Sequence, residues 1–467
     1  MSDLRTPYSP KNDSEPVFTY DPLKDKSRKI HGFGKPKKPW KKILGIAALI
    51  IAVIGGALAI YFYLQLSKIS TNLFGGPGKL KGEDEGRVNV LLLGIGDPGH
   101  DGEQLADTNL VVSLNTQTNQ VAMISIPRDT RVSIPGYGQA KINQANSNGF
   151  QESGEQGGVN LAKSTVEQTL GIPIHYYVKA NFTGLKQVVD AVGGVQIEVT
   201  ESLSDPEYPC DNDQYRSCGY KIKPGTYAMN GTDALKYARC RKGTCGDDFG
   251  RAKRQQQVIT AVREKVMSSS TVFNPAKLNS LLGAVSDNIR TDMSINNMLR
   301  VNEISKKIDK ANITNIVFSI KENGFLKSDP AGSSDLLPVG GSFKNIQAFV
   351  KDIFKYGPVW AEEPTLAIEN GTVTAGLASR LSDKIDKDGN YITIVSVGNA
   401  LTRDYTTTKL IDYTGGKKPK TLEYLQNLLG VKASEPEEKV ENPEADFRII
   451  VGADRIPTPT PVPETSN

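Results

Sequence analysis

Residues 88–97 read VNVLLLGIGD, and residues 106–130 read ADTNLVVSLNTQTNQVAMISIPRDT. Within the first segment, Val88–Leu93 (VNVLLL) is apolar apart from Asn89, which is typical of a strand buried on both faces. Within the second, Asn109–Leu114 and Val121–Ile126 have the composition of two short strands, and a polar turn joins them. These segments predict the middle of a sheet that other elements cover on both sides.

Segments with helical spacing alternate with the predicted strands along the chain. They are Leu161–Leu170, Phe182–Val192 and Gln255–Val266, while Val195–Val199 returns to strand alternation. Strands interleaved with helices indicate the α/β class. We therefore predict a three-layer α-β-α domain with a central mixed sheet over residues 87–355.

A second, smaller α/β unit is predicted over residues 364–454. Its elements follow the order βαββαβ, at Thr365–Ile368, Ala375–Lys387, Ile392–Val397, Lys409–Tyr413, Thr421–Leu429 and Phe447–Val451. Lys432–Glu444 is acidic and indicates a loop. Residues 455–467 are rich in proline and threonine, so we expect an extended tail there.

Residues 43–66 contain no charged side chain. At about 1.5 Å per residue, a helix of this length reaches roughly 35 Å, which is enough to cross a bilayer core of about 30 Å. We predict one transmembrane helix. A cleaved signal peptide is the alternative, but the apolar run is long for one and no small-x-small cleavage site follows it.

Charge is unevenly distributed along the 467 residues, which carry 56 Lys+Arg and 52 Asp+Glu. Residues 1–42 hold 11 Lys/Arg and 5 Asp/Glu, so the rest of the chain is net negative. The positive-inside bias predicts a single-pass cell-membrane protein with a cytoplasmic tail over 1–42, a stalk over 67–86 and both domains outside the cell. A nucleic-acid binder would carry its positive charge on the folded part, so no nucleic-acid partner is expected.

All four cysteines fall in the part predicted to be exported: Cys210, Cys218, Cys240 and Cys245. In an oxidising compartment such residues form disulfides. Of the three possible pairings we favour the two local ones, Cys210–Cys218 and Cys240–Cys245. A zinc site is the alternative, although no histidine lies near these residues to support it.

Gly94, Gly96 and Gly99 satisfy the dinucleotide-binding pattern G-x-G-x-x-G after a strand. Such a site also needs a helix to begin at the glycines, whereas Pro98 and His100 continue a loop. The sequence contains no Walker, G-x-S-x-G or H-E-x-x-H motif, so serine-hydrolase and zincin chemistry have no support either.

Arginines supply the strongest chemical signal in the sequence. Arg128 closely follows a predicted strand, at the kind of position where α/β sheets bind ligands. Arg239 and Arg241 are two residues apart, so an extended backbone would place both side chains on one face. The planar guanidinium fork suits carboxylates and phosphates, so convergent arginines favour a pyrophosphate site.

Two further polar residues, Arg251 and Gln255, share a helix face with the apolar stripe made by Val258, Val262 and Val266. A buried guanidinium is costly unless it is paired. Structural pairing is therefore the alternative to phosphate binding, and the available partners are Asp129, Asp247 and Asp248. Spacing alone leaves both interpretations open.

Asp97 follows the first predicted strand and Asp107 precedes the second. Both carboxylates could meet at one edge of the sheet and hold Mg²⁺, which prefers a few carboxylates together with phosphate oxygens. Either residue alone would more often belong to a turn or a cap.

Several motifs together resemble the LytR-CpsA-Psr family of cell-wall ligases. The matching stretches, in family order, are VNVLLLGIGD, ADTNLVVSLNTQTNQVAMISIPRDT, KINQAN, NFTGLKQVVDAVGGVQIEV, MNGTDALKYARCR and DDFGRAKRQQQVI. They cover about residues 86–270, with weaker similarity to about residue 345, and the predicted topology is also that of the family. The later stretches IENGTVTAGLASRLSDKI and FRIIVGAD resemble the small LytR-type C-terminal domain often attached to these proteins.

The resemblance implies a membrane-anchored phosphotransferase that uses Mg²⁺ (or Mn²⁺) and moves a glycopolymer from a polyprenyl-pyrophosphate lipid to a hydroxyl of peptidoglycan. It also implies an apolar tunnel for the prenyl chain. By motif, the metal ligands would be Asp97 and Asp107. The residues that would bind the pyrophosphate are Arg128, Arg239, Arg241, Arg251, Gln255 and Lys141. Asp129 is a further catalytic candidate, beside Arg128, Arg239 and Arg241.

Two features set this sequence apart from the family pattern. Members often carry an arginine two residues before the aspartate of the D-T motif, where this chain has Leu105. Cys240 and Cys245 flank Arg241, and we predict that a disulfide between them fixes the loop that carries Arg239 and Arg241.

Two other functions compete with ligation. A polyprenyl-pyrophosphate hydrolase would use the same site, with water in place of the sugar. A non-enzymatic wall-binding or regulatory anchor would pair its arginines internally and would have no lipid-sized cavity.

Overall fold

The structure, a computed structural model, describes residues 78–210, 213–268, 287–294, 297, 300–301, 303–304, 306–321, 324–387, 389, 391–436 and 443–456. The predicted cytoplasmic tail (1–42) and transmembrane helix (43–66) lie outside these residues, as does most of the predicted proline-rich tail. Within the described residues, no helix has both the length and the apolar character needed to cross a membrane.

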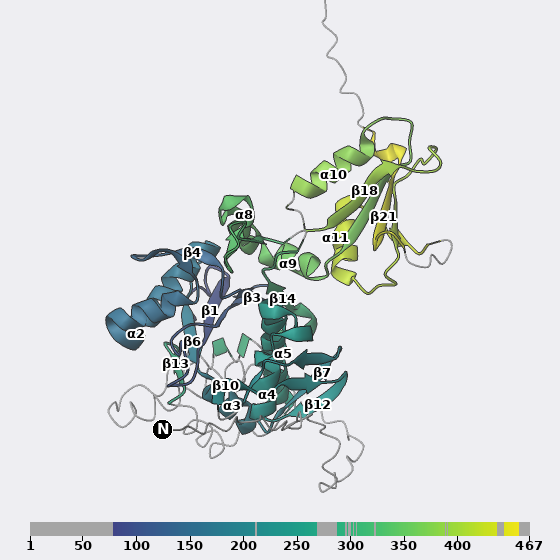
Figure 1. The fold of residues 1–467 in the computed structure, drawn as a ribbon. Coiled ribbons are helices and arrows are strands. Elements are labelled where there is room, and N and C mark those ends of the chain that lie inside the picture. The colour runs from purple at the N-terminus through teal and green to yellow at the C-terminus, as the bar shows by residue number, and fades with distance from the viewer. Residues whose placement is uncertain are drawn as a thin grey trace, which may run out of the picture.

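A six-stranded mixed sheet forms the centre of the larger unit in the described part of the chain (Figure 1). Its strand order is β13 (Ile289–Thr291), β6 (Tyr176–Ala180), β1 (Arg87–Gly94), β2 (Thr108–Asn115), β3 (Gln120–Ile126) and β14 (Ile313–Val317). The β1–β2 and β2–β3 pairs are antiparallel, whereas β1–β6 and β3–β14 are parallel. This confirms the three strands predicted from the apolar runs and the mixed character of the sheet.

Helices cover both faces of this sheet (Figure 1). The bounds of those on one face are α3 (Phe182–Ala191), α4 (Gly231–Arg239) and α5 (Asp247–Ser268), and those on the other are α2 (Gln144–Leu170), α8 (Lys344–Lys351) and α9 (Ile353–Ala361). Side chains alternate along β1, because Val88 and Val90 join the core with α3, α4 and α5, and Leu91 and Leu93 join the other core. Because helices cover the sheet on both faces, the domain has three layers.

Several short antiparallel pairs extend from the sheet domain. They are β4 (Arg131–Ile134) with β5 (Gly138–Lys141), β7 (Val195–Val199) with β12 (Gly225–Met229), β8 (Leu203–Asp205) with β11 (Tyr220–Ile222), β9 (Pro209–Cys210) with β10 (Asp213–Ser217), and β15 (Leu326–Ser328) with β16 (Leu336–Pro338). A 3-10 turn, η1 (Gly243–Cys245), packs beside β8.

Two helices begin earlier than the sequence pattern predicts. The helix expected from residue 161 starts at Gln144, with a break at Ser153 and Gly154. Its first half is rich in glycine and lacks apolar spacing, yet a Cβ on Gly149 would lie 2.3 Å from the carbonyl oxygen of Gly157, so close backbone packing explains the composition. The other helix, α5, begins at Asp247, whereas the predicted segment began at Gln255.

The C-terminal unit contains a five-stranded sheet in the order β18 (Thr393–Asn399), β17 (Thr365–Asn370), β21 (Phe447–Val451), β19 (Lys409–Asp412) and β20 (Ala433–Ser434). Helices α10 (Leu377–Lys387) and α11 (Pro419–Leu429) complete it. All six predicted elements are present, and the short strand β20 lies in the segment expected to be a loop.

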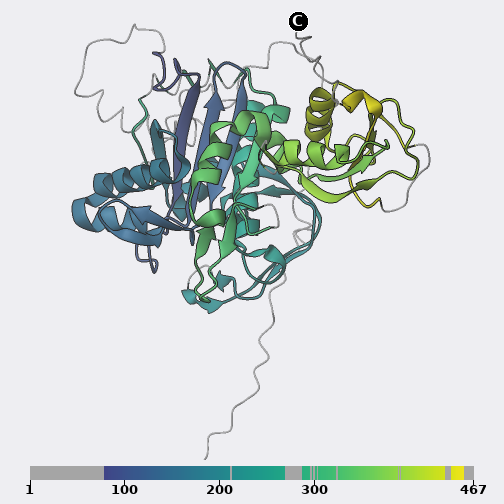
Figure 2. The ribbon, with the colours of Figure 1, turned by 90° about the horizontal axis from the view of Figure 1, so that it is seen from above.

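The two units meet at α9 (Figure 2). This helix packs on β3 and β14 of the large sheet and on α11 of the C-terminal unit. Tyr356 of α9 stacks on Tyr391 with ring centroids 4.4 Å apart. The sheet domain also starts before the predicted boundary at residue 87, because Leu80 is buried in its core and Glu83 pairs with Arg300. The end of the predicted stalk thus packs against the domain.

One partly buried carboxylate, Asp446, should make the C-terminal unit sensitive to acid. Asp446 accepts hydrogen bonds from the backbone N–H of Thr365 (2.7 Å) and from Lys418 Nζ (2.6 Å). Burial alone would raise the pKa of Asp446, but these donors outweigh it, so the pKa lies below the usual 3.8. Because the pKa in the folded state is lowered, the stabilisation is present above about pH 4 and is lost as the pH falls through the folded-state pKa.

Replacing Asp446 by asparagine should therefore lower the free energy of unfolding by about 1–3 kcal/mol at pH 7, and by much less near pH 3. Urea denaturation of the full chain at both pH values measures this difference. Asp404→Asn is a matched control, because Asp404 is exposed in the same unit. An equal loss for Asp446→Asn at both pH values would contradict the prediction.

Candidate functional site

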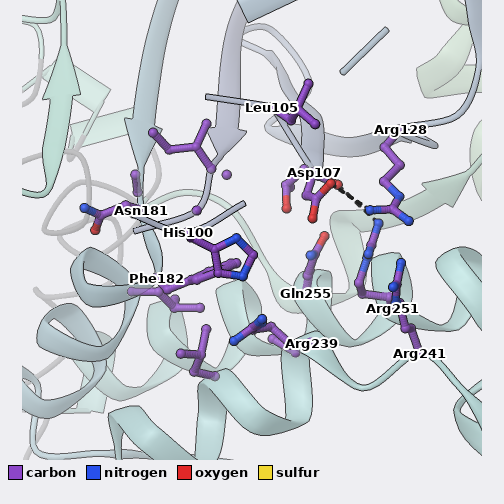
Figure 3. A pocket seen from close by; sticks show the side chains of 18 of the residues that line it. His100, Leu105, Asp107, Arg128, Asn181, Phe182, Arg239, Arg241, Arg251 and Gln255 are labelled. Atoms are coloured by element: carbon purple, nitrogen blue, oxygen red, sulfur yellow. Dashed lines mark hydrogen bonds and ion pairs between the residues drawn. The ribbon is translucent and has the colours of Figure 1, made fainter. Parts of the chain in front are cut away.

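A cavity of about 490 Å³ lies beside the carboxyl ends of the parallel strands β1 and β6 (Figure 3). One part of its lining is apolar and includes Leu92, Val178, Phe182, Leu185, Leu235, Ala238, Val258 and Ile259. The remaining part is charged and polar and includes Asp107, Arg128, Arg239, Arg241, Arg251 and Gln255. The cavity therefore combines an apolar wall with a charged part that is rich in arginine, which suits a lipid with an anionic headgroup.

The helix α4 delivers Arg239 to this cavity. Asn230 caps its first turn by accepting the N–H of Asp233 at 2.9 Å, and Arg239 is its last residue. Arg254 of α5 is buried and donates to the carbonyl oxygens of Tyr237 (3.0 Å) and Cys240, which fixes the C-terminal end of α4. Arg254 is therefore a structural residue rather than a ligand.

The extended backbone considered for Arg239 and Arg241 is wrong. Arg239 closes a helix, and Arg241 lies in the loop that follows it. The local pattern did not reveal this helix because it is only 9 residues long and depends on a cap supplied by α5. Both side chains nevertheless line the same cavity.

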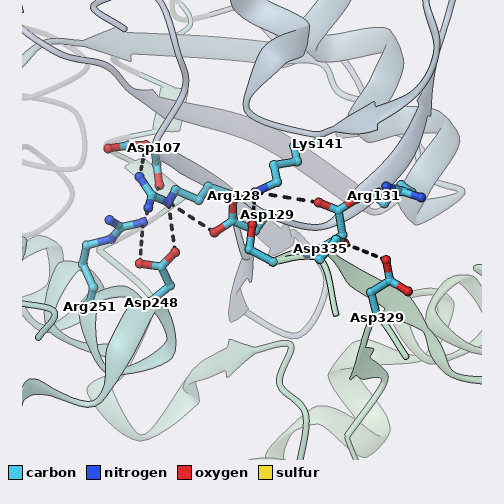
Figure 4. Close-up of polar contacts among 11 residues, drawn as sticks. Asp107, Arg128, Asp129, Arg131, Lys141, Asp248, Arg251, Asp329 and Asp335 are labelled. Carbon is cyan, nitrogen blue, oxygen red and sulfur yellow. Dashed lines mark hydrogen bonds and ion pairs between the residues drawn. The ribbon is translucent and has the colours of Figure 1, made fainter. Parts of the chain in front are cut away.

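Two of the other arginines are paired with aspartates (Figure 4). Arg128 contacts Asp107 at 2.9 Å, Asp248 at 3.0 Å and Asp129 at 3.5 Å. Arg251, which is 6% exposed, contacts Asp248 at 3.2 Å. The pairing considered for Arg251 is therefore present, with Asp248 as its partner. Arg128 is paired as well, with Asp107, Asp248 and Asp129.

Burial and these carboxylates shift the pKa values of the two arginines in opposite directions. For Arg128, burial disfavours the cation, but the aspartates outweigh it and raise its pKa above the ordinary value. For Arg251, burial dominates over Asp248 and lowers its pKa. The pairs hold both guanidinium groups at the edge of the cavity.

Arg239 and Arg241 differ from them, because no carboxylate in the described part of the chain forms an ion pair with either guanidinium. Arg239 instead lies 4.1 Å from the ring centroid of Phe182 and 5.8 Å from that of Tyr208. Such a cation–π contact orients the guanidinium while leaving its N–H donors for another partner. The positive charge of these two residues is therefore available to an anion in the cavity.

The two candidate metal ligands have different surroundings. Asp97 accepts from the backbone N–H of Thr183 (2.8 Å) and from its hydroxyl (3.0 Å) at the start of α3. Asp107 lines the cavity, and its Oδ1 accepts from Arg128. Asp107 keeps further lone pairs for a hard cation such as Mg²⁺. Asp97 is not among the residues that line the cavity, and its contacts with Thr183 are those of a residue that caps a helix.

Asp129 and Lys141 belong to a neighbouring polar network rather than to the cavity lining (Figure 4). Lys141 Nζ lies 2.6 Å from Asp129 and 3.7 Å from the buried Asp335, which also pairs with Arg131. The carboxylate of Asp129 is thus occupied by Lys141 and Arg128. Through Asp129, this network contacts Arg128 and helps to hold its side chain in place.

Both predicted disulfides, Cys210–Cys218 and Cys240–Cys245, are confirmed. Among the described residues, Asp205, Cys240 and Cys245 form the one group of three or more potential metal ligands with closely spaced ligand atoms. The two sulfurs are bonded to each other, so this group offers no thiolate and the zinc alternative gains no support.

Sequence reasoning missed several residues that line the cavity, including His100, Asn181 and Phe182 (Figure 3). The ring of His100 packs edge-on against Phe182, with centroids 5.5 Å apart. Asn181 and Phe182 directly follow β6, whose carboxyl end lies beside that of β1. Their position after a parallel neighbouring strand is the signal that could have found them. Leu105, where the family often has arginine, also lines the cavity.

Both units of the chain match known protein families. Residues 363–454 match the model described as LytR cell envelope-related transcriptional attenuator. The chain is 36% identical over 279 residues to the polyisoprenyl-teichoic acid–peptidoglycan teichoic acid transferase TagU of Enterococcus faecalis, which covers 57% of this chain and 83% of that protein. A protein of the same name from Oceanobacillus iheyensis is 32% identical over 291 residues, covering 58% and 82%.

Solved structures similar to this chain include those of B. subtilis TagV and of TagT bound to LI-WTA. TagV is 28% identical with a TM-score of 0.45, over 57% of this chain and 97% of that chain. TagT is 25% identical with a TM-score of 0.43, over 58% and 91%. The family model for LytR_cpsA_psr matches residues 63–334, which is more than half of the chain. The chain is therefore a member of the LytR_cpsA_psr family.

Proposed function

We propose that this protein is a phosphotransferase that moves a glycopolymer from a polyprenyl-pyrophosphate carrier to a hydroxyl group of peptidoglycan. The observation that carries the proposal is the cavity, whose apolar wall ends at two guanidinium groups without carboxylate partners among the described residues. The names of the TagU relatives, which specify a polyisoprenyl-linked donor and peptidoglycan, support the same chemistry.

In the proposed reaction, the acceptor hydroxyl oxygen attacks the phosphorus that bears the glycan. A new phosphoester bond forms, the phosphoanhydride bond breaks, polyprenyl phosphate leaves, and the hydroxyl proton is released. Such a displacement needs positioning and charge neutralisation more than a special nucleophile. Arg239 and Arg241 would bind the pyrophosphate oxygens directly, and Arg128 and Arg251 would hold the charged edge in place through Asp107 and Asp248.

A divalent cation is part of the proposal. Asp97 and Asp107 would hold Mg²⁺ or Mn²⁺, which would supply further neutralisation of the pyrophosphate. The backbone and hydroxyl of Thr183 orient Asp97 for this role, and Arg128 orients Asp107.

Removing divalent cations with EDTA should lower transfer by at least about 100-fold, and added Mg²⁺ should restore it. Asp107→Asn should raise the Mg²⁺ concentration needed for half-maximal activity, because a neutral amide oxygen binds the cation more weakly than a carboxylate. A titration of activity against Mg²⁺ measures both effects. Full activity in EDTA would contradict the metal assignment.

The proposal also places the protein in the cell membrane. The predicted span over residues 43–66 would anchor the chain with its N-terminus in the cytoplasm and the cavity outside. The prenyl chain of the donor could then enter the apolar part of the cavity from the adjacent bilayer.

The deciding experiment gives the full-length protein in detergent a lipid-pyrophosphate-linked glycan, with and without peptidoglycan. Appearance of the glycan on peptidoglycan supports the transferase. Release of glycan phosphate at the same rate without an acceptor would instead identify a hydrolase. No reaction in either case would favour the non-enzymatic anchor. The cavity argues against that function, as do Arg239 and Arg241, which form no ion pair with a carboxylate among the described residues.

A further inference from the structure

We propose that Asp205 is a positioning residue that fixes the backbone carrying Arg241, and so sets where this guanidinium meets the pyrophosphate. The inference rests on the proposed function, because it takes Arg241 to be a pyrophosphate ligand. Nothing in the sequence pattern distinguishes Asp205, which is the last residue of the short strand β8 and borders the cavity.

The contacts of Asp205 are directed at main-chain donors. Its side chain is almost wholly buried, with 2% exposed. Oδ2 accepts the backbone N–H groups of Arg241 (3.0 Å) and Lys242 (3.1 Å), and Oδ1 accepts that of Glu207 (3.1 Å). A buried carboxylate requires compensation, and here three amides supply it. In the described part of the chain no lysine or arginine side chain forms an ion pair with it.

This choice of partner has a chemical consequence for Arg241. An aspartate beside an arginine normally pairs with the guanidinium, as Asp107 does with Arg128. Asp205 binds the amide of Arg241 instead, so it holds the residue in place without consuming the N–H donors of its side chain. The loop is anchored and the cation stays available.

Other contacts hold the neighbours of Arg241 rather than the residue itself. Thr244 Oγ1 accepts the N–H of Ser204 (2.8 Å) and donates to the carbonyl of Ser202 (3.1 Å). The disulfide joins Cys240 to Cys245 across the loop. Within the described residues, Asp205 is the side chain that accepts the hydrogen bond of the Arg241 amide. Mutation can therefore separate the positioning of Arg241 from the general stability of the loop.

The test measures binding of inorganic pyrophosphate to the full-length protein by calorimetry in the presence of Mg²⁺. Asp205→Asn keeps the side-chain volume but replaces one acceptor oxygen with a donor, so at least one of the three amides loses its partner. A displacement of about 1 Å at a group that positions the substrate can lower the rate of an enzyme by up to roughly 100-fold. We expect about 10-fold weaker pyrophosphate binding for Asp205→Asn.

A double-mutant cycle separates positioning from general damage. In an Arg241→Ala background, Asp205→Asn should cause no further loss, because the group that it positions is gone. In an Arg128→Ala background the 10-fold loss should persist. Thr244→Val is the matched control, since it weakens the same loop and should lower the melting temperature while leaving the affinity within about twofold. If Asp205→Asn still weakens pyrophosphate binding about 10-fold in the Arg241→Ala background, the inference is overturned.

A second measurement does not depend on the variant folding. In the wild-type protein, hydrogen exchange at the Arg241 and Lys242 amides should be slower than at the exposed Gly246 of the same loop, and equal rates would overturn the inference. The two proposals fail differently. If the wild type does not bind pyrophosphate, the proposed function fails and takes this inference with it. If Arg241→Ala weakens binding and Asp205→Asn does not, only this inference fails.

Discussion

Replacing Arg239 by alanine should lower kcat/KM for glycopolymer transfer by roughly 10²–10³-fold. The guanidinium lies against Phe182 at the cavity, and no carboxylate in the described chain neutralises it. Its charge is therefore available to the pyrophosphate, whose negative charge shifts as the phosphoanhydride bond breaks. In a partly buried site, water cannot interact with the pyrophosphate as strongly as the preorganised guanidinium that it would replace.

The same substitution should leave the fold nearly unchanged. Among the residues that the structure describes, Arg239 has no carboxylate partner that its removal would leave uncompensated. Arg128 differs, because its removal would leave Asp107 and Asp248 without their partner. Arg239→Lys should recover only part of the activity, because the point charge remains but the fork is lost. Arg380→Ala, at an exposed position of α10, is the control. Equal activity of Arg239→Ala and wild type in the lipid-linked glycan assay would remove Arg239 from the site.

Filling the apolar part of the cavity should abolish use of long-chain donors. Leu185 of α3 lines the cavity and is only partly buried, so a tryptophan there can occupy the space without disturbing the core behind it. Displacing one isoprene unit of about five carbons costs about 4 kcal/mol at about 0.8 kcal/mol per buried CH₂, which corresponds to a loss of roughly 700-fold.

The informative feature of Leu185→Trp is its selectivity. Activity with the polyprenyl-pyrophosphate donor should fall, while binding of inorganic pyrophosphate should stay within about twofold of wild type, because the charged part of the cavity is not altered. Leu185→Met conserves volume and should behave like wild type. A Leu185→Trp protein that retains full activity with the long-chain donor would show that the prenyl chain lies elsewhere.

The sequence was most informative where one physical signal dominates. Val88–Leu93 lies in a strand that is buried on both faces, and its run of apolar residues, interrupted by Asn89, left no other reasonable assignment. Arg251 was expected on the core-facing side of its helix, and it is indeed buried, as is Val258. In both cases the local pattern of apolar residues predicts which side chains are buried.

The sequence was least informative where partners come from distant segments. The end of α4 depends on Arg254, and the loop after it depends on Asp205, which lies in another strand. Local spacing therefore indicated that Arg239 and Arg241 work together but gave the wrong backbone for them. Phe182 was assigned to a helix without any sign that its ring would support a cation.

The helix α9 ties the C-terminal unit to the rest of the chain more firmly than a linker would. Tyr356 belongs to the core of the large sheet, and Val359, less than one turn later, belongs to the core of the C-terminal sheet. A hinge at this point would have to pull one of these side chains into water. Whatever the C-terminal unit contacts is consequently kept at a constant distance and angle from the reactive end of the cavity.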